Sequence, residues 1–311
     1  MTRRDVLKTA AALGAGAAAD LFRPSMARAQ PSDPLAATRA QMAATPIVST
    51  PLMNIMTMFA GPGGNVIVQH GLDGKVVVDT FVQGAFAGLK QRLDAMGPIP
   101  ILFAIDTHWH FDHTDNNESF RKAGATVIAQ ANTSKRLFEP HDMLGMHFNP
   151  APAAALPAET FAQTHQLRLN NEYIELGYFQ PAHTDTDIYV QFVLAEVLHL
   201  GDTFFNGMYP FIDASTGGNI KGMIAAAHQA LRMAGPRAKI VPGHGALADR
   251  EALLKYRDML VTVRDRVQKL KAAGRTEKEV VAAKPTADLD PVWGQGFVQP
   301  DAFVTIVYNT L

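Results

Sequence analysis

The stretch THWHFDHTDN, at positions 107 to 116, constrains the fold more than any other part of the chain, because it places three histidines and two aspartates close together. It follows IPILFAID, a short continuous apolar run. Such a run predicts a buried strand. The sequence therefore predicts a site at the end of a buried strand, where α/β proteins often carry function on the following loop.

Strand and helix signals alternate around this cluster. NVIVQHGLDGKVVVDTF predicts two β-branched strands on either side of an Asp-Gly turn, and a helix is expected from about Ala85 to Met96. After the cluster, NNESFRKAG predicts a helix and ATVIAQ a second buried strand. The alternation favours a layered α/β fold.

The second half of the chain returns to strands and ends in helices. HQLRLNNEYIELGYFQP predicts two short strands, and three further strand-like runs, AHTDTDIYVQF, EVLHLGD and AKIVPGHG, each carry a histidine or aspartate at one end. NIKGMIAAAHQALRMAG predicts a helix, and REALLKYRDMLVTVRDRVQKLKAAG a long amphipathic one. TEKEVVAAK and DAFVTIVYNTL are expected to form short terminal helices.

Residues 141–160 break the pattern. HDMLGMHFNPAPAAALPAET contains three prolines and no clear period, so a loop is expected. Two alternatives stay open: a surface connection with a few apolar anchors, or a lid or wall over a pocket, because long unstructured loops are often functional.

The N-terminus has the features of an export signal. MTRRDVLK places paired arginines before a small-residue apolar stretch, which is typical of twin-arginine signals, and MARAQ offers a small-x-small cleavage site that predicts a mature start near Gln30. The apolar part is shorter than the roughly 20 residues of a membrane span. We therefore expect residues 1–29 to be a signal peptide, the twin-arginine export machinery to be a partner, and the mature protein to be periplasmic with no stable membrane anchor.

Composition narrows the remaining choices. With 311 residues, of which 47% are hydrophobic, the chain can bury a large core, and residues 30–311 are expected to form a single domain. A formal net charge of -1 gives no basic field that would favour nucleic acid. The chain has no cysteine, so it can form no disulfide and cannot carry a lipid on a cysteine at its mature end. A small molecule is the expected substrate.

The histidine and aspartate cluster suits divalent metals. On a turn after a strand, alternate residues His108 and His110 can face one metal while Asp112 and His113 face a neighbouring one. Imidazole nitrogens suit Zn²⁺ at neutral pH, and a carboxylate adds charge without sulfur.

The motifs HWHFDH, AHTDTD, LGD and PGHG occur in the order found in the metallo-β-lactamase fold superfamily, and the chain resembles that superfamily over essentially all of its mature part. The resemblance implies a four-layer αββα sandwich with a helical C-terminal extension and two zinc ions per chain. It assigns one metal to His108, His110 and His183, the other to Asp112, His113 and His244, with Asp202 as the bridge.

The resemblance also implies an activity. The expected enzyme is a dinuclear zinc hydrolase in which a metal-bridging hydroxide attacks a β-lactam, lactone, ester or thioester. Asp112 is the expected catalytic residue, because it would tie the ligand geometry to the orientation of the nucleophile. Two alternatives stay open: a mononuclear iron persulfide dioxygenase and, from another class, a non-catalytic metal-binding partner protein.

The segment FFNGMYPFIDASTGGN, directly after Asp202, combines aromatic and polar side chains as a small-molecule pocket requires. Asn206, Tyr209 and Phe211 are the expected substrate contacts. The alternative is that these aromatic residues fill the end of the core.

Overall fold

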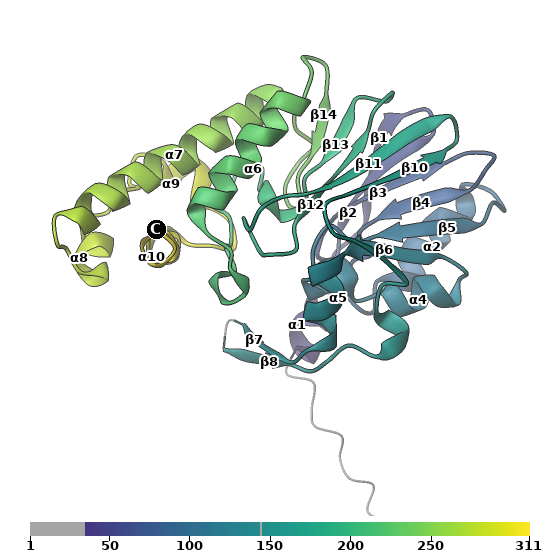
Figure 1. The fold of residues 1–311 in the computed structure, drawn as a ribbon, viewed down its shortest axis with the longest axis horizontal. Coiled ribbons are helices and arrows are strands. Elements are labelled where there is room, and N and C mark those ends of the chain that lie inside the picture. The colour runs from purple at the N-terminus through teal and green to yellow at the C-terminus, as the bar shows by residue number, and fades with distance from the viewer. Residues whose placement is uncertain (1–34, 144) are drawn as a thin grey trace, which may run out of the picture. The chain divides into compact units, whose positions relative to one another are not determined.

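The structure is a computed structural model that describes residues 35–143 and 145–311 (Figure 1). Pro34–Leu311 is one compact unit. The predicted signal peptide lies outside the described residues, so it stays a prediction. Among the described residues, no helix combines the length and the apolar character needed to cross a membrane.

A seven-stranded sheet carries most of the first half of the chain, in the order β1-β2-β3-β4-β5-β6-β9. Pairing is antiparallel from β1 to β4 and parallel from β4 to β9. The predicted hairpin is confirmed as β3 and β4, and the predicted buried strands as β5 and β6. The strands are β1 Val48–Met53, β2 Met56–Gly61, β3 Gly64–His70, β4 Lys75–Val78, β5 Ile101–Ile105, β6 Thr126–Gln130 and β9 Glu159–Phe161.

A five-stranded sheet follows, in the order β10-β11-β12-β13-β14. Its strands are antiparallel except for β13 and β14, which run parallel. All five were predicted from the alternating and apolar runs. They are β10 Thr164–Leu169, β11 Glu172–Tyr178, β12 Ile188–Phe192, β13 Val197–His199 and β14 Lys239–Val241.

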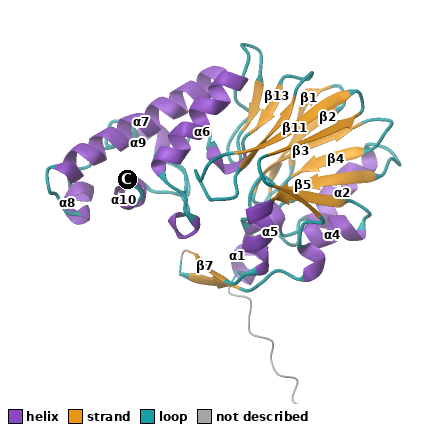
Figure 2. Cartoon of the chain, in the orientation of Figure 1, coloured by secondary structure: helices purple, strands orange, loops and turns teal. Residues whose placement is uncertain are grey.

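The two sheets face each other, and helices cover their outer faces (Figure 2). Residues such as Ile67 from the first sheet and Val190 from the second share the buried layer between them. The outer face of the first sheet packs against α2 (Phe86–Ala95) and α4 (Asn117–Lys122). The outer face of the second packs against α6 (Ile220–Met233) and α7 (Arg250–Ala272). The predicted αββα sandwich is confirmed.

The remaining helices are short. The predicted terminal helices are α8 Glu277–Ala282 and α10 Pro300–Asn309, which pack with α7 in the same apolar cluster as the second sheet. The helices that the sequence did not predict are α1 Ala36–Ala43, α3 Phe111–Thr114, α5 Ala131–Phe138 and α9 Asp290–Trp293.

Residues 141–160 are more regular than the sequence predicted. They contain a small hairpin of β7 (His141–Met143) and β8 (Met146–Phe148), and they end in β9, which extends the first sheet beside β6. The loop prediction was therefore wrong. These strands are three residues long, too short to give a periodic signal, and the sequence does not reveal the strands that they pair with.

Candidate metal centre

The seven predicted ligands come from separate segments, most of them at strand ends. His108 and His110 follow β5, Asp202 follows β13 and His244 follows β14. Asp112 and His113 lie in α3, and His183 lies between β11 and β12.

The fold brings these side chains into two groups that could each hold a metal ion. Within each group, the candidate ligand atoms lie within 4.8 Å of one another. The first group is His108, His110, His183 and Asp202, and the second is Asp112, His113 and His244.

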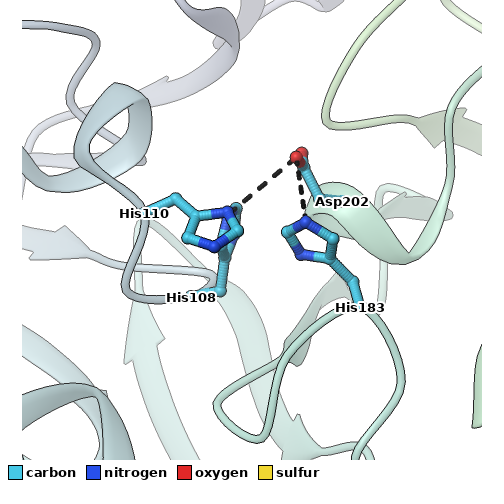
Figure 3. A group of neighbouring side chains, drawn as sticks. All are labelled: His108, His110, His183 and Asp202. Atoms are coloured by element: carbon cyan, nitrogen blue, oxygen red, sulfur yellow. Dashed lines mark ion pairs between the residues drawn. The ribbon is translucent and has the colours of Figure 1, made fainter. Parts of the chain in front are cut away.

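Asp202 lies between the groups. Its Oδ1 is 3.3 Å from Nε2 of His113, and its Oδ2 is 3.3 Å from Nε2 of His244. The same Oδ2 is 3.7 Å from Nε2 of His183 and 3.9 Å from Nε2 of His108 (Figure 3). One carboxylate therefore reaches both groups, as the predicted bridging role requires.

The cluster is buried on one side and accessible on the other. Side-chain exposure is 1% for His108 and for His113 but 12% for Asp112 and 25% for His244. Asp112 Oδ2 lies 3.4 Å from Nε2 of His244 and 3.6 Å from Nε2 of His113. The cluster is therefore accessible to solvent on the side of Asp112 and His244.

Several buried atoms of the cluster lack a hydrogen-bond partner among the described residues. They include Nε2 of His108, His113 and His183, and Oδ1 of Asp202. A buried polar atom left in this state costs about 1–3 kcal/mol. Because these lone pairs converge on one small volume and belong to ligand types that Zn²⁺ accepts, the residues present fit a metal centre.

Carboxylates outside the seven contact the other ring nitrogens. Asp79 Oδ2 lies at hydrogen-bond distance, 2.8 Å, from Nδ1 of His113. Asp187 Oδ1 lies 3.5 Å from Nδ1 of His183 without a hydrogen bond. Such partners orient metal-binding histidines and strengthen them as ligands. Asp79 is also held at a φ of 65°, a conformation uncommon for residues other than glycine and often found at functional sites.

Asp79 was not predicted as a site residue, although the sequence carries a signal for it. It follows VVV, a fully buried stretch of β4, so it is a carboxylate at the end of a core strand. Both the backbone N–H and the hydroxyl of Thr107 donate to it, which ties the end of β4 to the start of the ligand-bearing turn.

The pKa values of the candidate ligand histidines shift in opposite directions. Burial lowers the pKa of His108 well below its ordinary value and also lowers the pKa of His110, which favours neutral imidazoles. Burial opposes the charged forms of His113 and His244 as well, but the nearby carboxylates, above all Asp202, outweigh it. They raise the pKa of His113 well above its ordinary value and that of His244 to about 10. A metal that binds there must displace protons.

Two glycines allow the backbone to come this close to the ligands. A Cβ atom at Gly243 would lie 1.9 Å from Oδ1 of Asp202. Gly64 has a φ of +142°, and a Cβ there would lie 2.8 Å from the carbonyl oxygen of Gly243. Larger residues at either position would push the turn away from the cluster.

Of the predicted substrate contacts, Phe211 lies beside the ligands. Its ring centroid is 6.0 Å from that of His110 and 6.0 Å from that of His183. Phe211 also packs against the apolar cluster that joins Trp109 to the β7–β8 hairpin through Phe148. The hairpin therefore lies beside the ligand turn and is anchored to it by apolar side chains.

The other two predicted substrate contacts, Asn206 and Tyr209, use their side chains in hydrogen bonds within the protein. The Asn206 side chain donates to the carbonyl of Ala246, and its backbone N–H donates to the carbonyl of His244, so it supports the turn that carries this ligand. Tyr209 is 1% exposed, and its hydroxyl donates to Asp290 at 2.8 Å. Tyr209 therefore lies in the packing of the C-terminal helices, as the core alternative had it.

Comparison with known proteins gives one family. The family model described as Metallo-beta-lactamase superfamily matches residues 61–244, a range that contains all seven predicted ligands. No match was found among curated proteins.

Solved structures with the same fold include a metallo-beta-lactamase from Pontibacter korlensis, with a TM-score of 0.60 and 18% identity, over 69% of this chain and 99% of that one. The DIM-1 metallo-beta-lactamase has a TM-score of 0.57 and 19% identity, over 70% of this chain and 98% of that one. The sec-alkylsulfatase Pisa1 from Pseudomonas sp. has a TM-score of 0.65 and 18% identity, over 85% of this chain but only 50% of the sulfatase. At these identities, the shared property is the fold.

Proposed function

The chain belongs to the metallo-beta-lactamase superfamily, and on that basis we propose that it is a dinuclear zinc hydrolase for a β-lactam, lactone, ester or thioester. The observation that carries the proposal is the placement of Asp202, whose carboxylate oxygens lie 3.3 to 3.9 Å from histidine nitrogens of both candidate ligand groups. A site for one ion needs no carboxylate shared between two groups.

The ligand roles follow from the two groups. Asp202 would bridge the two ions. Two bound zinc ions would supply Lewis acidity, which lowers the pKa of a shared water from about 16 toward about 7 and polarises a carbonyl oxygen. One ion would be held by His108, His110 and His183, and the other by Asp112, His113 and His244.

Asp112 is the proposed catalytic residue because of where its oxygens lie. Its Oδ2 faces His113 and His244, and it sits on the accessible side of the cluster. Burial opposes the ionised form, but His113 and His244 outweigh it and lower the pKa of Asp112, so the carboxylate is charged at neutral pH. It can therefore accept a hydrogen bond from an attacking water and hold that water toward the substrate.

The proposed location is the periplasm, reached through the twin-arginine pathway. The paired Arg3 and Arg4 and the alanine-rich cleavage motif before Gln30 support this. Fractionation of cells that express the full chain should find a shortened protein in the periplasm. Replacing both arginines with lysine should leave the full-length chain in the cytoplasm.

A sulfate ester is the second candidate substrate. It is favoured by the match to the sec-alkylsulfatase, which covers 85% of this chain against 69% for the Pontibacter protein.

A substrate screen tests the proposal. The zinc-loaded protein is assayed with a chromogenic cephalosporin, an aryl lactone, an aryl ester, an acyl thioester and a secondary alkyl sulfate. We expect zinc-dependent turnover of a carbonyl substrate, lost in Asp112→Ala. Turnover of the sulfate alone would favour the second candidate. Two bound zinc ions without turnover of any substrate would overturn the hydrolase and favour a non-catalytic metal-binding partner protein.

A further inference from the structure

The segment after Asp202, which was predicted to contact substrate, also contacts the candidate ligand His110 through the side chain of Asp213. Asp213 Oδ2 lies 3.2 Å from Nε2 of His110, and the two residues are 2% and 4% exposed. We propose that Asp213 is a positioning residue of the metal centre, which holds His110 by Nε2 and so leaves Nδ1 for the metal. This inference rests on the metal site of the proposed function.

The two oxygens of Asp213 have separate tasks. Oδ1 accepts from the backbone N–H of Ser215 at 3.0 Å and from its hydroxyl at 2.5 Å, which caps the short helix Ala214–Thr216. Oδ2 accepts from the hydroxyl of Thr216 at 2.7 Å and faces His110. Capping alone would use only Oδ1, so the contact of Oδ2 with His110 is additional to the cap.

The donors around Asp213 determine the direction of the contact with His110. Two hydroxyls and a backbone N–H already point at the carboxylate, so it acts only as an acceptor. His110 Nε2 must therefore donate. In a neutral imidazole with its proton on Nε2, Nδ1 keeps a free lone pair, which is the state that a metal ligand requires.

The same turn also fixes His183. The backbone N–H of Asp213 donates to the carbonyl of His183 at 2.9 Å, and the N–H of Gly218 donates to the carbonyl of Asp213 at 2.9 Å. A Cβ atom at Gly218 would lie 2.1 Å from the carbonyl oxygen of His183. One turn thus contacts two histidines of the first group, His110 by a side chain and His183 by the backbone.

The test compares Asp213→Asn with Ser215→Ala. Asparagine keeps the shape of the side chain but replaces one acceptor oxygen with a donor amide. Ser215→Ala removes a hydroxyl from Oδ1 and leaves the backbone N–H and the contact to His110 in place. Long-range proton–nitrogen NMR of the ¹⁵N-histidine-labelled, metal-free protein reads the His110 tautomer, and chelator competition reads the affinity for zinc.

We expect the wild type to carry the His110 proton on Nε2. Asp213→Asn should shift that tautomer and weaken one zinc ion about 10- to 100-fold, while Ser215→Ala should match the wild type within about twofold. A wild-type His110 protonated on Nδ1, or an Asp213→Asn protein that binds both ions as tightly as the wild type, would overturn the inference. A wild type that binds no zinc would refute the proposed function, and its His110 tautomer would still decide the role of Asp213, even if the Asn variant failed to fold.

Discussion

Removing the Asp112 side chain takes a ligand from one candidate group and leaves the other group complete, so it tests whether the two groups bind separate ions. Asp112 supplies one of the three ligands of the second group, and its Oδ2 lies 3.4 and 3.6 Å from the Nε2 atoms of His244 and His113. The first group keeps all four of its side chains in Asp112→Ala. We therefore expect the metal content to fall from about two ions to about one.

The loss of activity should be larger than the loss of metal suggests. Asp112→Ala removes both a ligand and the group that orients the attacking water, and loss of an acid–base group alone costs about 10²- to 10⁴-fold in rate. A 10²-fold loss corresponds to about 2.7 kcal/mol of barrier. The assay is kcat on the substrate found in the screen, with metal content measured on the same sample.

Glu159→Ala is the matched control. Glu159 Oε1 lies 3.5 Å from His165 Nε2, so this variant also breaks a carboxylate–histidine contact, but one formed by β9 and β10 rather than by the ligand-bearing turns. It should keep the metal content and kcat of the wild type. An Asp112→Ala protein that binds two ions and turns over like the wild type would refute the reasoning.

Three further predictions follow from the geometry. Because the pKa of His244 is raised from 6.5 to about 10, its proton stabilises the metal-free fold below pH 6.5, and this stabilisation is lost as the pH rises through about 10. The apparent affinity for zinc should rise over the same range, and a flat profile in chelator competition between about pH 6 and 9 would contradict this. Gly243→Ala should abolish binding of the second ion and destabilise the fold by about 1–3 kcal/mol in urea unfolding, since its Cβ would lie 1.9 Å from Asp202 Oδ1. Phe211→Ala should raise KM about tenfold with little change in kcat, and an unchanged KM would refute a contact between this ring and the substrate.

The sequence predicted the elements whose signals are local. The strand before His108 is a continuous apolar run, and the Asp-Gly turn marks the β3–β4 hairpin. The ligand residues lie in compact motifs at strand ends. The strands β1, β2 and β7 to β9 were not predicted. β1 and β2 form a hairpin whose register is irregular near Met53. β7, β8 and β9 are each three residues long, and β9 is recognisable as a strand only from its pairing with the distant β6.

The carboxylates that contact the ligand histidines could not be predicted from local sequence signals, because each of them lies far along the chain from its histidine. His113 and Asp79 are 34 residues apart, and His110 and Asp213 are 103 apart. Tyr209 shows the same limit: an aromatic residue beside a ligand suits a pocket wall or a core equally well. Its hydrogen bond to Asp290, 81 residues away, places it in the core.

The metal content of the protein, purified from its own host without added metal and measured by inductively coupled plasma mass spectrometry, tests the central claim most directly. Two groups of ligands that share Asp202 predict about two zinc ions per chain. About one iron ion per chain with little zinc would contradict the dinuclear zinc centre and indicate oxygen-dependent chemistry on a sulfur substrate instead.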